Sequence, residues 1–327
     1  MKVNLFYRKK RKYAYSIEEL FKSISKKLTN YNSIKIELPY SKASMKEIYL
    51  NCLFCIKYFN KLNHVTGDVH YIVPFLGSKT ILTIHDVKSI LQGNFISYSI
   101  KKLFWFWLPI LFAKKITVIS NFTKKEVLKI APWAKKKITI IPNPINFRYL
   151  SQIKKQQNVK FTVLIIGTKT NKNLTRIFNS LKSLDLKLNI IGNLSKEQKT
   201  LAKDLKLNYT NYQNLNYKEV LEIYSKSDLL CFPSIYEGFG MPILEAQAIG
   251  IPVLTSNLSP MKDIAGESAL LVNPYSIKNI RECIIRIIES PILQEELIIK
   301  GKENVLRYDI HAIAKQYENL YKEIENV

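Results

Sequence analysis

The sequence predicts an α/β fold of two domains, each built on a parallel β-sheet that helices cover. In the second half of the chain, short apolar segments alternate with helical patterns. These segments are continuous apolar runs, as expected for parallel strands that are buried on both faces. The first half has a similar but less regular rhythm, and 327 residues are enough for two ordinary domains.

The elements of the first half follow from its apolar segments and caps. We expect strands at 3–7, 34–38, 79–84, 116–119 and 137–141, and helices at 17–28 and 45–62. Ser120 or Asn121 can cap the helix that follows 116–119. The polar segment 143–158 contains Pro144 and predicts the link between the domains, which we expect to span residues 1–148 and 149–308.

The second half is more regular. We expect strands at 159–166, 186–191, 228–232 and 251–256, and helices at 173–184, 196–205, 217–224 and 243–249. A last helix is expected at 309–325, and residues 309–327 form the remaining segment.

The loop after the strand at 228–232 carries the strongest functional signal. Residues 232–245 read Phe-Pro-Ser-Ile-Tyr-Glu-Gly-Phe-Gly-Met-Pro-Ile-Leu-Glu and lead into a helix. The N–H groups of Gly240, Met241 and Ile243 are expected to face a phosphate. Glu237 would lie before the first helical turn and Glu245 inside it, where each carboxylate can accept hydrogen bonds from sugar hydroxyls. The pattern indicates a nucleotide-sugar site, although an acidic residue there can also simply complement the helix dipole.

The stretch 233–246 resembles the signature of glycosyltransferase family four, which are retaining enzymes of the GT-B fold. The resemblance continues through 250–257, 265–274 and 166–174. It implies two doubly wound, Rossmann-like parallel-sheet domains facing a cleft, with the last helix crossing back onto the first domain. It also implies that Glu237 contacts the hydroxyls of the donor sugar and that Glu245 contacts those of the ribose. The remaining donor-binding residues expected in this loop are Gly238, Phe239, Gly240 and Met241.

A second phosphate-type loop, Gly167-Thr-Lys-Thr-Asn-Lys-Asn173, follows a strand and opens a helix. Similar enzymes place a lysine here on the donor pyrophosphate, which matches Lys172. Lysine is a compact charge suited to a departing phosphate. Many relatives also carry an arginine straight after the glycine, where this chain has Thr168. Either Lys169 takes the second positive role or one lysine suffices.

Three polar residues are candidates in the first half. His85 ends the strand at 79–84, where ligands bind in parallel sheets, and in similar enzymes a histidine here touches the donor sugar. Asp86 can orient His85 or cap the next helix. His70 is a weaker candidate on the acceptor side. Each histidine can instead be a structural residue.

The N-terminal loop departs from the glycine-containing loop that many relatives have after the first strand. Arg8-Lys-Lys-Arg-Lys12 is strongly basic. Arg8 and Lys9 on the acceptor side would suit a phosphate-bearing acceptor such as a lipid diphosphate sugar. The alternative is a solvated run of charges.

The net charge of +24 is unevenly distributed. Residues 1–150 contain 27 Lys and Arg against 7 Asp and Glu, whereas residues 151–327 contain 23 against 19. Codon bias explains much of the lysine, but not its concentration in one half. An anionic membrane surface is therefore an expected partner, because each basic residue near such a surface contributes about 1 kcal/mol. A non-catalytic nucleic-acid-binding protein is the alternative from another class, but the scarcity of arginine weighs against it.

Neither a metal nor a cofactor is expected besides the nucleotide-sugar donor. The chain contains no Asp-x-Asp triplet and no ligand cluster that would replace it. Cys52 and Cys55 are spaced like a metal or redox pair, but they are better explained as two apolar residues on a buried helix face.

The sequence contains no apolar stretch long enough to span a membrane, and its longest candidate, 103–112, is interrupted by Pro109. The N-terminus lacks the pattern of a signal peptide. We therefore expect a cytoplasmic protein, peripheral at the inner face of the plasma membrane.

Together these features predict a retaining, metal-independent glycosyltransferase. We expect it to move a sugar from a nucleoside-diphosphate donor to a lipid-linked or glycan acceptor in capsule, O-antigen or lipopolysaccharide synthesis. A GT-B phosphorylase or sugar-phosphate synthase is the nearer alternative, but it needs a further phosphate pocket that the sequence does not reveal.

Overall fold

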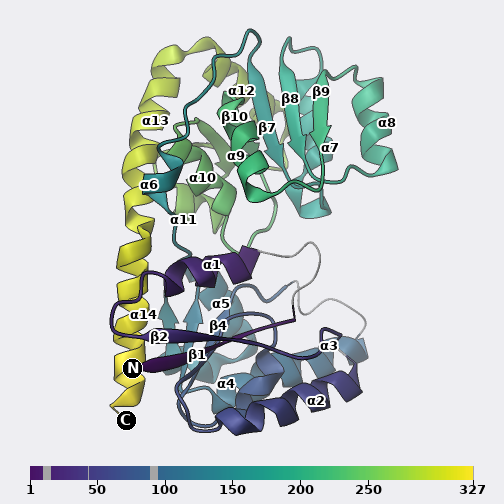
Figure 1. The fold of residues 1–327 in the computed structure, drawn as a ribbon. Coiled ribbons are helices and arrows are strands. Elements are labelled where there is room, and N and C mark those ends of the chain that lie inside the picture. The colour runs from purple at the N-terminus through teal and green to yellow at the C-terminus, as the bar shows by residue number, and fades with distance from the viewer. Residues whose placement is uncertain (10–15, 43, 89–94, 327) are drawn as a thin grey trace. The chain divides into compact units, whose positions relative to one another are not determined.

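The computed structural model describes residues 1–9, 16–42, 44–88 and 95–326. It divides the chain into two compact units. The first holds Met1–Pro144 and Ile310–Val327, and the second holds Ile145–Asp309. Each unit is built on a six-stranded sheet with helices packed around it (Figure 1). Every strand pairing is parallel, so the predicted α/β class is confirmed.

The sheet of the first unit has the strand order β2-β1-β3-β4-β5-β6. Its strands are β1 (Lys2–Tyr7), β2 (Asn32–Glu37), β3 (Asn63–Val65), β4 (Thr80–Ile84), β5 (Lys115–Val118) and β6 (Ile138–Ile140). The direction of the strand order reverses between β1 and β3, so the carboxyl ends of these strands mark the point where ligands bind in such sheets. Strand β3 was not predicted from the sequence.

Helices of the first unit come from both ends of the chain. They are α1 (Ser16–Ser25), α2 (Met45–Cys55), α3 (Phe95–Lys101), α4 (Leu108–Phe112), α5 (Asn121–Ile130) and α14 (Ile310–Glu325). Helix α14 contributes Ile313, Tyr317 and Tyr321 to a buried cluster with Val3 and Leu5 of β1. Its Glu318 accepts hydrogen bonds from the backbone N–H groups of Thr29 and Asn30, at 2.6 and 2.7 Å.

The helix predicted at 45–62 is shorter than expected. Helix α2 ends at Cys55, and a 3₁₀ turn (Ile56–Tyr58) leads to β3. Cys52 and Cys55 are free and buried, and burial raises the pKa of their thiols to about 11 and about 12. Both therefore pack in the core as neutral thiols, which agrees with the structural interpretation of this pair.

The sheet of the second unit has the order β12-β11-β10-β7-β8-β9. Its strands are β7 (Thr162–Ile166), β8 (Lys187–Ile191), β9 (Tyr209–Tyr212), β10 (Leu229–Phe232), β11 (Val253–Ser256) and β12 (Leu270–Val272). The order reverses between β7 and β10, which pair directly with each other. The carboxyl ends of these two strands therefore form the second topological switch point of the protein.

The helices of the second unit connect its strands and cover its sheet. They are α6 (Phe147–Leu150), α7 (Leu174–Leu181), α8 (Lys196–Asp204), α9 (Tyr217–Ser225), α10 (Met241–Ile249), α11 (Met261–Ala265), α12 (Ile277–Glu289) and α13 (Pro291–Val305). In the part of the chain that the structure describes, no helix is both long and apolar enough to cross a bilayer.

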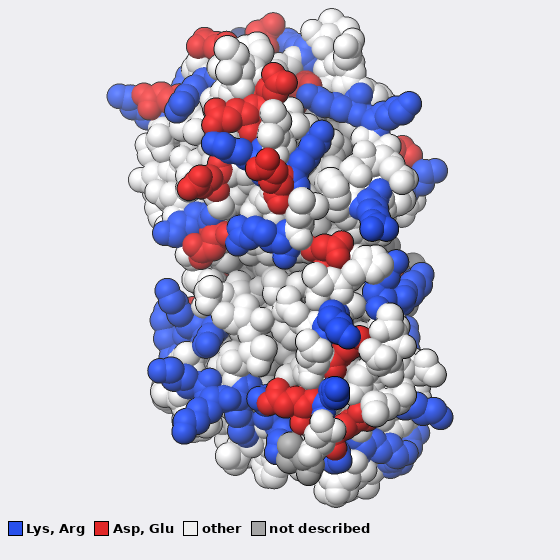
Figure 2. All heavy atoms as spheres, turned by 90° about the vertical axis from the view of Figure 1, so that its left-hand side faces the viewer, with Lys and Arg blue, Asp and Glu red and all other residues white. Residues whose placement is uncertain are grey.

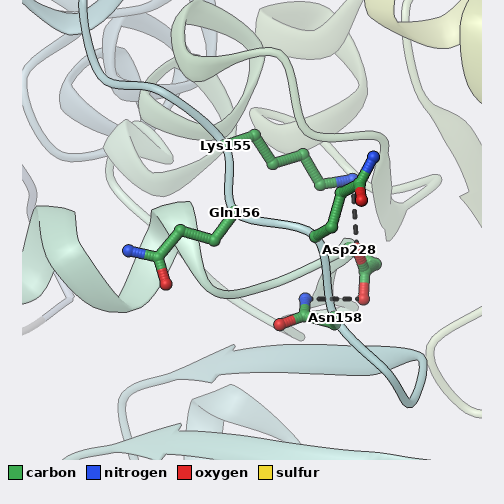
Figure 3. Close-up of a pocket in the computed structure, with 5 residues that line it drawn as sticks. Lys155, Gln156, Asn158 and Asp228 are labelled. Carbon is green, nitrogen blue, oxygen red and sulfur yellow. Dashed lines mark hydrogen bonds and ion pairs between the residues drawn. The ribbon is translucent and has the colours of Figure 1, made fainter.

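A small pocket lies at the amino-terminal ends of β7 and β10. Lys155 and Asn158 converge there on Asp228, with an Nζ–Oδ1 distance of 3.1 Å and an Nδ2–Oδ2 distance of 2.9 Å (Figure 3). The second carboxylate oxygen also accepts the N–H of Thr162. These bonds fasten the segment before β7 to the sheet, at the edge opposite to the carboxyl ends of the strands.

Candidate functional site

Two loops meet at the switch point of the second unit because β7 and β10 are neighbours. The loop after β7 contains Lys172, and the loop after β10 contains Glu237. Nζ of Lys172 lies 2.6 Å from Oε1 of Glu237. The structure thus brings together two residues that the sequence predicted for one site but that lie far apart along the chain.

One glycine and one asparagine set the shape of the first loop. Gly167 has a φ of +87°, and a Cβ there would lie 2.8 Å from Cε of Lys172, so a larger residue would displace the lysine. Asn173 adopts a left-handed conformation with a φ of 64°, which asparagine tolerates better than most residues. Its amide donates to the carbonyl oxygens of Pro233 and Pro274, at 3.1 and 2.6 Å. One side chain therefore ties together the loops after β7, β10 and β12.

The ammonium group of Lys172 is held in a fixed position by its neighbours. Its side chain is 17% exposed and that of Glu237 is 14% exposed. Its ammonium also lies 4.5 Å from the centroid of the Phe232 ring, a cation–π contact. The amide of Asn171 donates to the carbonyl oxygen of Tyr236 at 2.8 Å and approaches Oε1 of Glu237 at 3.3 Å. The pair is therefore partly shielded from water and held by neighbouring loops.

Lys169 is placed differently. Its side chain is exposed, while its carbonyl oxygen accepts the N–H of Lys172 at 2.8 Å. The neighbouring Thr168 donates its hydroxyl to the carbonyl oxygen of Asn193 at 2.7 Å. The structure thus pairs Lys172, and not Lys169, with Glu237.

Helix α10 begins with the geometry of an anion site. Gly240 has a φ of +114° and directly precedes the helix, with Pro242 in its first turn. The N–H of Ile243 was expected to face a ligand, but it donates to the carbonyl oxygen of Gly240 at 3.0 Å. Within residues 95–326 the N–H groups of Gly240 and Met241 have no such partner, so these two remain as donors for an anion.

Phe239 and Gly238 have distinct positions in the loop. Phe239 is buried, and its ring meets that of Tyr308 edge to face, with centroids 5.8 Å apart. It anchors the loop to the second unit. Gly238 is half-buried, next to Glu237.

The expected position of Glu245 in the first turn of its helix was wrong. Helix α10 begins at Met241, so Glu245 lies in the second turn. Its carboxylate accepts hydrogen bonds from the hydroxyls of Tyr224 at 2.7 Å and Tyr217 at 3.3 Å. Burial raises the pKa of Glu245, and the two tyrosine bonds partly oppose this by lowering it. No sequence pattern pointed to these tyrosines, which belong to α9.

His85 follows β4 at the carboxyl edge of the first sheet and is half-buried. Its Nε2 lies 2.9 Å from the carbonyl oxygen of Thr66. A carbonyl oxygen only accepts hydrogen bonds, so Nε2 carries the proton. Burial lowers the pKa of His85, so the ring is neutral at physiological pH and its Nδ1 is a hydrogen-bond acceptor.

His70 lies in a 3₁₀ helix (His70–Phe75) and is 1% exposed. Its Nδ1 donates to the carbonyl oxygen of Trp105 at 2.7 Å, and burial lowers its pKa to about 4. His70 is thus a neutral residue of the core. It supports the segment that contains Trp105.

The acceptor-side candidates are already engaged within the first unit. Arg8 binds the carboxylates of Glu18 at 2.9 Å and Asp68 at 3.2 Å, and Lys9 donates to the carbonyl oxygen of Pro39. Glu18 and Asp68 were not predicted as site residues. Asp86 is half-buried, beside His85. The rest of the basic run, residues 10–12, lies outside the described residues.

Among the residues that the structure describes, no group of three or more His, Cys, Asp and Glu side chains could hold a metal ion. The switch point of the second unit presents one ammonium group, two carboxylates and the N–H groups that begin α10. Such a set can bind a diphosphate and orient sugar hydroxyls.

Residues 147–304 match the family model of the glycosyl transferases group 1. This domain belongs to that family. The match covers both loops of the candidate site, so the resemblance seen in the sequence is confirmed. It also favours an enzyme over the non-catalytic nucleic-acid-binding alternative.

Relatives extend the likeness along the chain. The O-antigen chain mannosyltransferase RfbU of Salmonella typhimurium is 26% identical over 271 residues, which cover 81% of this chain and 74% of that protein. The capsular polysaccharide biosynthesis glycosyltransferase CapM of Staphylococcus aureus is 29% identical over 146 residues, which cover 43% of this chain and 38% of CapM. The crystal structure of Anabaena HepE in complex with UDP-glucose superposes with a TM-score of 0.79 at 13% identity, covering 99% of this chain and 100% of HepE. This last likeness concerns the fold, which is GT-B.

Proposed function

We propose that the chain is a retaining glycosyltransferase that moves a sugar from a nucleoside diphosphate to a hydroxyl of a cell-surface glycan or its lipid-linked precursor. The observation that carries this proposal is the Lys172–Glu237 pair, 2.6 Å apart and next to the start of α10. It combines a cation for a diphosphate with a carboxylate for sugar hydroxyls, which is what a nucleotide-sugar donor requires.

Lys172 stabilises the leaving group. As the bond from the sugar to the diphosphate breaks, negative charge accumulates on the phosphate oxygens and positive charge on the sugar ring. A fixed ammonium and the N–H groups of Gly240 and Met241 lower the energy of that state more than that of the bound donor. The partial burial of Lys172 strengthens the effect because less water screens its charge.

The two glutamates hold the two ends of the donor. Glu237 accepts hydrogen bonds from the hydroxyls of the transferred sugar, beside the diphosphate. Glu245 accepts hydrogen bonds from the ribose, and the tyrosine hydroxyls on its carboxylate fix its orientation. A hydrogen bond from a hydroxyl to a carboxylate is strong because the acceptor is charged. Each contact therefore favours a nucleotide sugar that has a hydroxyl at that position.

His85, in the first unit, has the right chemistry to accept a hydrogen bond from a sugar hydroxyl. Its Nδ1 is an acceptor because Nε2–H is engaged with Thr66. A neutral ring accepts a hydrogen bond from a sugar hydroxyl without repelling the positive charge that develops on the sugar.

We propose turnover without a metal ion, since Lys172 and the helix N-terminus supply positive charge at the diphosphate. Addition of EDTA in place of magnesium should leave the rate nearly unchanged. Strict dependence on a divalent cation would contradict this part of the proposal.

A hydrolysis screen across UDP-, GDP- and ADP-sugars tests the function without knowledge of the acceptor. The name of the relative RfbU makes mannose donors the first to test. One donor should be hydrolysed slowly, with release of the sugar in the anomeric configuration of the donor, which NMR reports. Failure of every donor to bind or react, with wild-type protein that is folded, would contradict the proposal.

A further inference from the structure

One helical segment of the first unit has an apolar face that points outward. The segment runs through α3, a π-helical stretch (Lys102–Trp107) and α4. Exposed apolar side chains recur along it every few residues. They are Ile100, Leu103, Phe104, Trp107 and Leu111, which are between 38% and 59% exposed.

The inward face of the same segment already completes the core. Phe106, Pro109 and Ile110 are buried, and the ring of His70 meets that of Phe106 with centroids 5.7 Å apart. The outer apolar side chains are therefore not needed for packing. Contiguous exposed apolar surface of this kind marks an interaction site in soluble proteins.

Trp133 extends this surface from a neighbouring element. Its ring lies edge to face with Trp107, with centroids 5.8 Å apart, and it is 53% exposed. The indole N–H of Trp107 donates to the carbonyl oxygen of Ile130 at 2.7 Å, which fixes the position of that ring. Two tryptophans with exposed faces suit the boundary between lipid and water, where amphipathic rings are favoured.

The stretch of chain that forms this surface is strongly basic. Residues 95–137 contain ten lysines and one acidic residue, Glu126. Nζ of Lys102 lies 4.8 Å from the Trp107 ring centroid, and Lys137 donates to the carbonyl oxygens of Ile110, Leu111 and Ala113 at the end of α4. Figure 2 views the molecule from the left-hand side of Figure 1, a different side from that of α3, and basic side chains gather there too, along one margin of the first unit.

We propose that the docking face, defined as Ile100, Leu103, Phe104, Trp107, Leu111 and Trp133, binds the surface of an anionic lipid bilayer. The apolar side chains enter the boundary of the acyl chains, and the surrounding lysines meet the anionic headgroups. A second copy of the chain fits less well, because two such faces would bring their lysines together.

Co-sedimentation of the full-length chain with vesicles tests the proposal. Wild-type protein should bind vesicles of phosphatidylglycerol mixed with phosphatidylcholine far better than vesicles of phosphatidylcholine alone. The double variant F104S/L111S should lower the partition coefficient about tenfold or more, because two exposed apolar side chains no longer enter the lipid. The charge variant K135E/K136E should lower it by at least about fivefold for each lysine removed.

Matched variants on the second unit serve as controls. I292S removes an apolar side chain that is 81% exposed, and K196E/K199E reverses two exposed lysines of α8. Both should bind as the wild type does. All altered side chains are exposed, so circular dichroism should report intact folding for every variant.

Three results would overturn the proposal. F104S/L111S could bind as the wild type does, the second-unit controls could lose as much binding, or neutral vesicles could bind the wild type equally well. Light scattering adds a further check. A dimer that F104S/L111S converts to a monomer would assign the face to a second copy of the chain instead.

Discussion

Replacing Lys172 with methionine removes its ammonium group and keeps a flexible side chain of similar length. In the structure this ammonium lies 2.6 Å from Glu237, with both side chains largely buried. Loss of a fixed positive group at a developing anion lowers kcat by about 10²–10³-fold, which corresponds to roughly 3–4 kcal/mol of transition-state stabilisation. KM for the donor should rise by less than about tenfold, because the ground state has less charge to stabilise.

The assay is donor hydrolysis or sugar transfer, measured across donor concentrations so that kcat and KM separate. K169M is the matched control, because Lys169 is exposed and lies in the same loop. It should stay within about threefold of the wild type, as expected for an exposed charge. If K172M keeps a wild-type kcat, or if K169M is equally damaging, the assignment of the leaving-group charge to Lys172 is wrong.

Three further predictions follow from other contacts of the structure. E237Q and E245Q should each cut turnover strongly while the thermal unfolding temperature changes little, and full activity in both variants would contradict the site. Y224F removes a hydrogen bond that lowers the pKa of Glu245, so the acidic limb of kcat/KM should move to higher pH, and an unchanged limb would refute the orienting role of Tyr224. Burial acts to raise the pKa of Glu318, but the hydrogen bonds from Asn30 and Thr29 lower this pKa overall. The ionised carboxylate therefore stabilises the folded first unit at pH values above the unfolded pKa of about 4.3. This stabilisation is lost as the pH falls further. E318Q should therefore destabilise the first unit by about 2 kcal/mol at neutral pH, and the difference from wild type should shrink in acid.

The tryptophans provide the measurement for Glu318. Trp105, Trp107 and Trp133 are the three tryptophans of the chain, and all of them belong to the first unit. Tryptophan fluorescence during urea unfolding therefore follows that unit separately from the second. Equal acid sensitivity of wild type and E318Q would contradict the prediction.

In the second sheet, apolar runs in the sequence predicted four strands, whereas β9 and β12 were not predicted. β7, β8, β10 and β11 are continuous apolar runs because helices cover both sides of the sheet. Strand β3 was not predicted because its sequence, Asn63-His-Val65, is largely polar, although the strand is buried. The amide of Asn63 donates to the carbonyl oxygens of Tyr58 and Leu76, at 2.9 and 3.1 Å, and these partners come from tertiary structure.

The sequence predicted the two loops of the candidate site, but it did not predict the side chains that hold their residues in position. Glycine, proline and charge patterns located Lys172, Glu237 and Glu245, since local backbone geometry requires those residue types. The bonds of Glu245 to Tyr224 depend on how α9 packs against α10, which no local pattern encodes. The turn that contains Glu245 was wrong for a related reason, because the left-handed Gly240 fixes where α10 begins.

The return of α14 to the first sheet has a consequence for biosynthesis. Val3 and Leu5 need Ile313, Tyr317 and Tyr321 to complete their shared core, yet these three residues are synthesised after the whole second unit. The second unit lies between them in the chain, so it can fold while the first unit still exposes apolar surface. Domains usually fold in the order in which they leave the ribosome. In this protein the second unit can complete its fold before the first unit does. The first unit exposes apolar surface, to which chaperones can bind, until residues near 321 leave the ribosome.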